Sequence, residues 1–163
     1  MVEFFRRLPG AMVLLLATAA GAEESPAEPI EFSIGDINGM VIDMADYRNQ
    51  WVVVNFWATW CKPCRKEIPF LDAIHRERDD VTVIGLAFEE VGPEEIKAFL
   101  VDYPATYPIA LIDVYEPPDT FGVPRVLPTT VIVDPSGRRA ETFLGPVERH
   151  DIENFIDGEP TDD

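Results

Sequence analysis

The sequence predicts a single α/β domain in which a mixed β-sheet carries helices on both faces. Two β-favouring runs, Trp51–Trp57 (WVVVNFW) and Val81–Phe88 (VTVIGLAF), are apolar almost without interruption. Such runs are typical of strands that are buried on both faces of a parallel sheet. The segment between them, 61–78, has the apolar spacing of a helix. At 163 residues, the chain has the length of one such domain.

The other expected elements flank this centre. Asn38-Gly39, between two short apolar runs, predicts a hairpin over 32–43. Alternating strands and helices that end in a hairpin and a helix indicate a mixed sheet. The remaining expected helical segments are 93–103, 116–122 (a weak turn) and 147–156. The remaining expected strands are 109–112, 129–134 and 139–144, the last two joined by a turn at 135–137.

Both ends of the chain are expected to lie outside the domain. Two arginines precede a short apolar run at 11–20, and Ala20-Gly21-Ala22 fits the small-residue rule for signal peptidase. Residues 1–22 therefore predict a cleaved secretory signal peptide and an exported, periplasmic or extracytoplasmic protein. An apolar run counted from Leu8 would instead be a marginal, uncleaved membrane anchor, and this alternative stays open. Residues 23–30 read as a flexible leader and 158–163 as an acidic disordered tail.

The chain is strongly acidic. It has 30 Asp and Glu against 13 Lys and Arg, which gives a formal net charge of −17. This charge repels nucleic acid and anionic membrane surfaces and so argues against both as partners. A basic partner would suit it, but a solvated acidic surface is the simpler interpretation.

The two cysteines, Cys61 and Cys64, are three positions apart. A disulfide that closes so small a loop removes little entropy from the unfolded chain, so it would be a poor structural staple. A structural zinc site needs four ligands, and only His75 and His150 could join the cysteines, with no helpful spacing. We therefore expect redox chemistry, no metal, and two histidines that face solvent.

The position of Cys61 favours a reactive thiolate, the form in which a thiol reacts. Cys61 lies where a strand run ends and a helix begins, and the free N–H groups and dipole of a helix start favour negative charge. Lys62 adds a nearby cation, and Pro63 fits the first helical turn and stiffens the loop. Cys64, one helical turn on, is placed to resolve a mixed disulfide.

The segment 54–69 (VNFWATWCKPCRKEIP) resembles the active-site segment of the thioredoxin superfamily, and within it the exported TlpA/ResA/CcmG-like branch. Residues 127–134 (LPTTVIVD) resemble the Pro-Thr-Thr segment of that branch, and 32–48 resemble its N-terminal hairpin and following short helix. The resemblance covers about 32–156. It implies that 31–157 form a thioredoxin-like domain, with a central mixed sheet flanked by helices and an added N-terminal β-hairpin.

The resemblance also implies a substrate site. Pro128 would have a cis peptide bond and face the cysteine pair, while the backbone beside it would pair with an extended substrate segment. Position alone leaves an ordinary trans proline at the start of a strand as the alternative. The residues expected to contact substrate are Trp60, Lys62, Pro63, Leu127 and Thr129.

Glu67 follows Cys64 by three residues and so lies on the same helical face. The ResA-like branch has an acid here, which makes Glu67 a candidate proton acceptor for Cys64. The alternative is a solvated glutamate paired with a basic neighbour. Thioredoxin itself has a buried acid six residues before its first cysteine, where this chain has Asn55, which cannot titrate.

The expected activity is reduction of protein disulfides by dithiol exchange, with no cofactor beyond the cysteine pair. The resemblance suggests a monomer recharged by a membrane electron donor of the DsbD/CcdA type, with apocytochrome c as one substrate class. A peroxiredoxin-type peroxidase stays open, although such enzymes have Thr or Ser where this chain has Ala58. A copper-binding module of the Sco type also stays open, although those proteins use a wider CxxxC motif.

Overall fold

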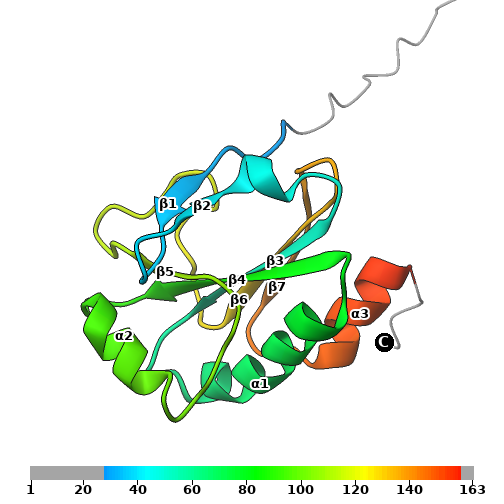
Figure 1. The fold of residues 1–163 in the computed structure, drawn as a ribbon. Helices are drawn as coiled ribbons and strands as arrows, with labels where there is room; N and C mark the ends of the chain where they lie inside the picture. The colour runs from blue at the N-terminus through cyan, green and yellow to red at the C-terminus, as the bar shows by residue number, and fades with distance from the viewer. Residues whose placement is uncertain (1–27, 159–163) are drawn as a thin grey trace, which may run out of the picture.

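A five-stranded mixed sheet forms the centre of the fold (Figure 1). The structure is a computed structural model that describes residues 28–158, so the expected signal peptide, most of the leader and nearly all of the acidic tail lie outside the described residues. The strand order is β5-β4-β3-β6-β7, in which β3, β4 and β5 are parallel and β6 and β7 are antiparallel to their neighbours. These strands are β3 (Trp51–Trp57), β4 (Val81–Phe88), β5 (Ile109–Ile112), β6 (Thr129–Val133) and β7 (Arg139–Leu144).

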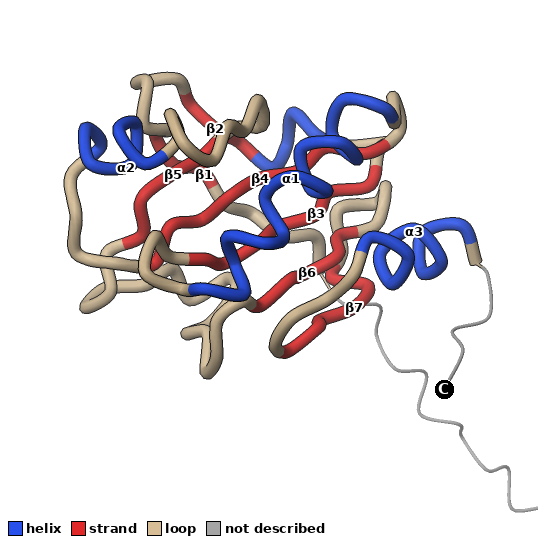
Figure 2. The backbone as a smooth tube through the Cα atoms, turned by 90° about the horizontal axis from the view of Figure 1, so that it is seen from below, coloured by secondary structure: helices blue, strands red, loops and turns tan. Residues whose placement is uncertain are grey.

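The helical elements are divided unequally between the two faces of the sheet, so the expectation of helices on both faces is met on the second face only by a short 3-10 helix. The three α-helices lie on one face of the sheet (Figures 1 and 2), and their buried residues belong to the hydrophobic cluster on that face. The opposite face is covered by the N-terminal hairpin, a short 3-10 helix and the loop around Phe121. The helices are α1 (Lys62–Glu77), α2 (Pro93–Phe99), α3 (Arg149–Asp157) and the 3-10 helix η1 (Met44–Tyr47); the hairpin joins β1 (Ser33–Gly35) to β2 (Val41–Asp43).

The side chains of β3 alternate between the two hydrophobic clusters. Val53 and Trp57 lie in the cluster under α1, and Val54 and Phe56 lie in the cluster under the hairpin. Both faces of this strand are therefore buried, which explains why WVVVNFW shows no polar alternation. The sequence-based expectation of a doubly buried central strand is confirmed.

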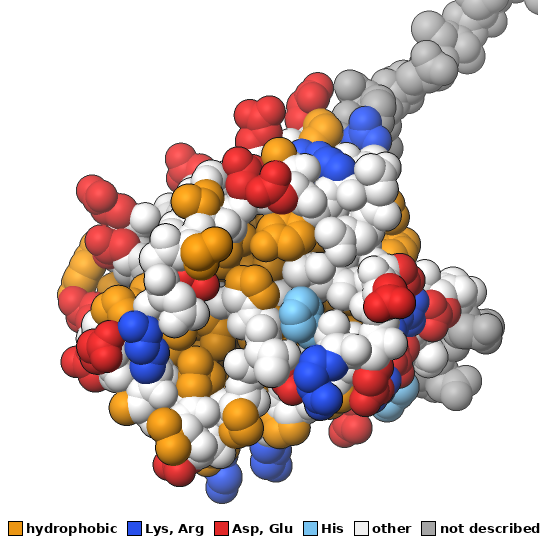
Figure 3. Space-filling view, in the orientation of Figure 1, with side chains coloured by type: hydrophobic (Ala, Val, Ile, Leu, Met, Phe, Trp, Pro, Cys, Tyr) orange, Lys and Arg blue, Asp and Glu red, His pale blue; other side chains and the backbone are white. Residues whose placement is uncertain are grey.

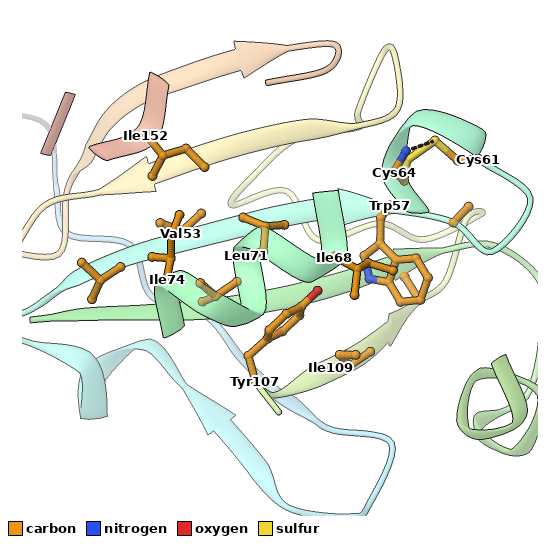
Figure 4. Close-up of a cluster of buried hydrophobic side chains, with 14 of the residues drawn as sticks. Val53, Trp57, Cys61, Cys64, Ile68, Leu71, Ile74, Tyr107, Ile109 and Ile152 are labelled. Carbon is orange, nitrogen blue, oxygen red and sulfur yellow. Dashed lines mark hydrogen bonds between the residues drawn. A yellow bond between two sulfur atoms is a disulfide. The ribbon is translucent and has the colours of Figure 1, made fainter. Parts of the chain in front are cut away.

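Helix α1 packs on the sheet through one apolar stripe. Ile68, Leu71 and Ile74 are fully buried against the sheet, as the close-up in Figure 4 shows. The helix begins after Cys61 and ends before Arg78, whose guanidinium donates to the carboxylates of Asp80 and Asp157. The stripe and this end contact fix the direction in which the first turn of α1 points.

Two expected helical segments differ from the structure. The helix expected over 93–103 ends at Phe99, because the next turns close through i→i+3 bonds and the chain leads into Pro104. No helix forms over 116–122, since Pro117 and Pro118 supply no N–H donors; the turn there is closed by the Gly122 amide bonding to the Asp119 carbonyl.

Three boundaries shift for local reasons. Strand β6 ends at Val133, one residue early, because the Asp134 carboxylate accepts backbone N–H groups of the following turn. Helix α3 starts at Arg149, after a capping box formed by Glu148 and Asp151. Ile30, expected in the flexible leader, is buried and its N–H donates to the Gly137 carbonyl at 2.7 Å.

Acidic side chains are spread over the face seen in Figure 3, both near the hairpin and near α3. This distribution agrees with the solvated acidic surface expected from composition. Within residues 28–158, no helix combines the length and the apolar character needed to cross a membrane.

Gly85 in β4 has no room for a side chain. A Cβ atom there would lie 3.0 Å from Tyr107 Cε2 and 3.1 Å from Trp57 Nε1, and both of these side chains are buried. We expect Gly85→Ala to lower the free energy of unfolding by about 1–3 kcal/mol, measured by urea denaturation of the oxidised protein. Gly35→Ala is the matched control, because its Cβ meets no atom within 4 Å. Equal effects of the two substitutions would contradict this packing.

Candidate active site

The cysteine pair lies at the junction of β3 and α1 as an oxidised disulfide, with an S–S distance of 2.02 Å. Cys61 is the N-cap of α1, and its Sγ accepts a hydrogen bond from the Cys64 N–H at 3.3 Å (Figure 4). Both residues are largely buried, Cys61 with an exposed fraction of 4% and Cys64 with 1%. The expected place of Cys61, between the end of a strand and the start of a helix, is confirmed.

The sulfur of Cys61 occupies the position that a serine or aspartate oxygen usually takes at a helix N-cap. The first N–H groups of a helix have no partner within the helix, and together with the helix dipole they favour negative charge nearby. In the reduced protein, the same bond from the Cys64 N–H would stabilise a Cys61 thiolate relative to the thiol. The site can thus supply a sulfur nucleophile with a second sulfur one turn away.

The segment before β6 brings a cis proline to the same end of the sheet. The peptide bond between Leu127 and Pro128 is cis, as expected. Thr129 begins β6 opposite Phe56, close to the end of β3 from which the chain runs to Cys61. Leu127 packs against the hydrophobic cluster that contains both cysteines. The antiparallel register of β6 thus places the cis-proline segment (126–128) beside the turn 58–61 that leads to Cys61, here called the redox turn.

A groove of about 400 Å³ opens between the redox turn and the cis-proline segment. Trp60, whose exposed fraction is 67%, and Leu127 both line it. The full lining is Trp60, Phe88, Glu89, Glu90, Val114, Pro124, Arg125, Val126 and Leu127. The groove is therefore apolar around Trp60 and Leu127 and charged towards the end of β4.

The structure brings together only part of the expected substrate-contacting set. Trp60 and Leu127 share the groove, whereas Lys62 is exposed and Pro63 half-buried on the first turn of α1. Thr129 is buried at 4% exposure and lines a different, smaller hollow of about 190 Å³. Its hydroxyl donates to the Val126 carbonyl at 2.7 Å, so it braces the cis-proline segment from within.

Glu67 is buried on the inner face of α1 at 2% exposure. Its Oε1 accepts the Val147 N–H at 2.9 Å, and its Oε2 accepts the Asn55 amide at 3.2 Å. Burial raises the pKa of Glu67 to about 7, and these two hydrogen bonds only partly oppose the rise. The alternative of a solvated, ion-paired glutamate is wrong. A buried carboxyl that titrates near neutral pH lies one turn from Cys64.

Asn55 has a structural place that its sequence position did not reveal. Its side-chain amide donates both to Glu67 and to the Thr130 hydroxyl, the latter at 3.0 Å. It therefore links β3, β6 and α1 in one buried polar network. Asn55 cannot titrate itself, so in this network the carboxyl of Glu67 is the group that can take up a proton.

The sequence did not single out Glu89 as a functional candidate. Glu89 is buried at 9% exposure directly after β4, and its carboxylate accepts two hydrogen bonds from Thr59 in the redox turn. In the sequence it is one of two adjacent glutamates in an acidic chain. The available signal was its place at the carboxyl end of a parallel strand next to β3, because such ends meet at one edge of a sheet.

The two histidines take different positions. His150 is exposed, as expected. His75 is half-buried, its Nδ1 accepts the Val83 N–H at 3.3 Å, and burial lowers its pKa, so the expectation that it faces solvent is wrong. Across the described part of the chain, no three His, Cys, Asp or Glu side chains gather where they could share a metal ion.

Burial of Glu67 predicts a specific pH dependence of stability. The folded protein holds the Glu67 proton up to about pH 7, whereas the ordinary pKa is 4.5, so the contribution of this group to stability falls as pH rises through that window. Glu67→Gln lacks this titration. As pH rises from 5 to 8, we therefore expect the unfolding free energy of wild type to fall by roughly 2–3 kcal/mol relative to that of Glu67→Gln. Urea denaturation of both oxidised proteins measures this, and parallel pH profiles would contradict it.

The comparisons with known proteins agree with this geometry. The model of the AhpC/TSA family matches residues 26–139. The thiol-disulfide oxidoreductase ResA of Bacillus thuringiensis is 30% identical over 131 residues, which cover 79% of this chain and 75% of that protein. The thioredoxin-like protein YneN of Bacillus subtilis is 31% identical over 140 residues, covering 84% and 81%.

A solved structure extends the likeness to the fold. A DsbF homologue from Corynebacterium diphtheriae is 30% identical and superposes with a TM-score of 0.69, covering 86% of this chain and 96% of that one. Relatives and site geometry together point to a protein-disulfide oxidoreductase with a thioredoxin-like fold. The chain belongs to the AhpC/TSA family, among its thioredoxin-like thiol-disulfide oxidoreductases.

Proposed function

We propose that this protein reduces disulfide bonds of exported proteins by dithiol exchange at Cys61 and Cys64. The observation that carries the proposal is the hydrogen bond from the Cys64 N–H to the Cys61 sulfur at the start of α1. This contact favours a thiolate at Cys61, and the thiolate is the attacking species in exchange.

The reaction balances without a bound cofactor. In the reduced protein, the Cys61 thiolate attacks one sulfur of a substrate disulfide, and the other substrate sulfur leaves as a thiolate that takes a proton. The Cys64 thiol then loses its proton and attacks Cys61 in the mixed disulfide. The second substrate thiolate leaves, the Cys61–Cys64 disulfide forms, and two electrons have passed to the substrate.

Glu67 is the proposed acceptor for the Cys64 proton. It lies one helical turn from Cys64, and burial raises its pKa to about 7. A base is most effective when its pKa is near the working pH. Its hydrogen bonds to Val147 and Asn55 hold the carboxyl in place, which favours transfer directly or through one water molecule.

Substrate binding is proposed along the groove beside Trp60. An extended segment of the substrate would pair with the backbone around Pro128, with Leu127 and Trp60 contacting its side chains on either side of the disulfide. Thr129 would position this backbone, and Lys62 and Pro63 would shape the first turn of α1 against the substrate. The large exposed fraction of Trp60, 67%, supports a contact role for it.

The proposal also covers the direction of exchange, the electron donor and the substrate. We infer an exported reductant, with a cleaved signal peptide, that is recharged by a membrane dithiol donor of the DsbD/CcdA type. Relatives named thiol-disulfide oxidoreductase support the type of reaction. Apocytochrome c is one candidate substrate, by resemblance to the exported branch alone. An external donor is required, because each turnover leaves the protein oxidised at Cys61 and Cys64.

A peroxidase is the second candidate, because the matching family model is described as AhpC/TSA. Two features weigh against it. Ala58 has no hydroxyl at the position where peroxiredoxins carry Thr or Ser, and the hydroxyl of Thr59 already donates to Glu89 at 2.9 Å. Consumption of hydrogen peroxide by the reduced protein, at a rate comparable to its disulfide reduction, would favour the peroxidase.

Trapping of mixed disulfides tests the exchange mechanism. In Cys64→Ser, the Cys61 thiolate can still attack, but no second sulfur can release the substrate. We expect this variant, expressed in its native compartment, to accumulate disulfide-linked adducts through Cys61, seen on non-reducing gels and identified by mass spectrometry.

Cys61→Ser is the control and should form few adducts, because the remaining thiol of Cys64 is the more deeply buried one. The mechanism is wrong if well-expressed Cys64→Ser forms no adducts, or if Cys61→Ser forms as many.

A further inference from the structure

Glu89 is a buried carboxylate that has neutral partners. It directly follows β4, its exposed fraction is 9%, and the ion pairs found among residues 28–158 do not include it. Burying a charge without a counter-charge costs free energy even when hydrogen bonds are made to it. A buried charge at this cost, beside a reactive site, is a candidate for a functional role.

Both oxygens of Glu89 bind one residue of the redox turn. Oε1 accepts the Thr59 N–H at 2.7 Å, and Oε2 accepts the Thr59 hydroxyl at 2.9 Å. In the parallel pairing of β3 with β4, Trp57 lies opposite Ala87, so Thr59 and Glu89 each lie two residues past that pair. The carboxylate thus continues the link between the strands beyond the point where their ladder ends.

This link fixes the turn that presents Cys61. The Cys61 N–H donates to the Ala58 carbonyl at 3.1 Å, which closes the turn around Thr59 and Trp60. Because Thr59 is held from the side by Glu89, a negative charge is brought to the turn that carries the reactive sulfur.

Other charged groups border the same turn. Glu90 and Arg125 line the groove together with Glu89 and Trp60, and Lys62 begins α1 beside Cys61. Glu67 lies on the buried side of α1. Glu89 differs from the exposed Glu90 because burial and two short hydrogen bonds fix its charge in one place, where solvent screens it less.

We propose that Glu89 is a positioning residue that holds the redox turn through Thr59 and, by its fixed negative charge, opposes ionisation of the Cys61 thiol and so favours the disulfide over the dithiol. A like charge disfavours a thiolate, and a couple whose reduced form is less stabilised is a stronger reductant. The inference rests on the proposed reductase function. It makes the charge of Glu89 one physical reason why the protein would donate electrons to disulfides rather than accept them from thiols.

Glu89→Gln tests the charge while keeping size and an acceptor for the Thr59 N–H. In the reduced protein, we expect the pKa of Cys61, followed by thiolate absorbance, to fall. Above that pKa, the equilibrium with glutathione should shift about tenfold towards the dithiol, equivalent to about 30 mV. Glu89→Asp keeps the charge, so its pKa of Cys61 and its equilibrium with glutathione should be nearer to the wild-type values than those of Glu89→Gln.

Two further variants separate charge from scaffolding. Thr59→Val removes one hydrogen bond to the same carboxylate but leaves its charge, so the pKa of Cys61 should not fall. Glu90→Gln removes an exposed charge one residue away and should have a smaller effect than Glu89→Gln. If Glu89→Gln does not fold, the double variant Thr59→Val/Glu89→Leu replaces both partners by apolar groups, and the same fall is expected.

The inference is overturned if removal of the Glu89 charge leaves the pKa of Cys61 and the glutathione equilibrium unchanged, or if Thr59→Val shifts both as much and in the same direction. The second result would mean that the link is only structural. Failure of the proposed function would look different, because wild type itself would then show no reversible dithiol–disulfide equilibrium with glutathione.

Discussion

The hydrogen bond from the Cys64 amide to the Cys61 sulfur is the interaction on which the site depends. It exists because β3 ends at Trp57 and α1 begins at Lys62, so that Cys61 falls at the helix cap. The buried stripe of α1, which includes Ile68 and Leu71, holds the helix on the sheet and sets the direction of its first N–H groups. The hydrophobic core thus positions the helix dipole, which in the proposed mechanism favours Cys61 over Cys64 as the nucleophile.

Two buried carboxyl groups, Glu67 and Glu89, lie near this helix end, and the proposals give them different tasks. Glu67 lies one helical turn from Cys64 in a network with Asn55, and burial raises its pKa to about 7. Glu89 lies beside the turn that carries Cys61, where its bonds to Thr59 come from neutral donors. Glu67 is suited to accept a proton, whereas Glu89 is suited to hold a negative charge in a fixed position. In the proposed mechanism, the helix end favours the Cys61 thiolate and the charge of Glu89 opposes it. The difference between these two effects would help to set the direction of exchange.

Most of the sheet was predictable, because strands buried on both faces leave continuous β-branched and aromatic runs such as Val81–Phe88. The early end of α2 at Phe99 was not, since the segment stays apolar as the backbone tightens into turns. The cysteines were found from their spacing, and Pro128 from the resemblance of its segment to that of a known family. Glu89 was not, because its contact with Thr59 depends on how β4 and β3 are aligned, and both residues lie two positions past the last pair of that ladder.

If the helix end makes Cys61, and not Cys64, the reactive sulfur, the two thiols should differ in their reactivity. Partial alkylation of the reduced wild-type protein with iodoacetamide across a range of pH, followed by mass spectrometry of the peptides, measures the reactivity of each thiol. We expect Cys61 to be modified first and to ionise at a lower pH than Cys64. Preferential modification of Cys64, or equal and slow modification of both thiols at every pH where the protein stays folded, would contradict it.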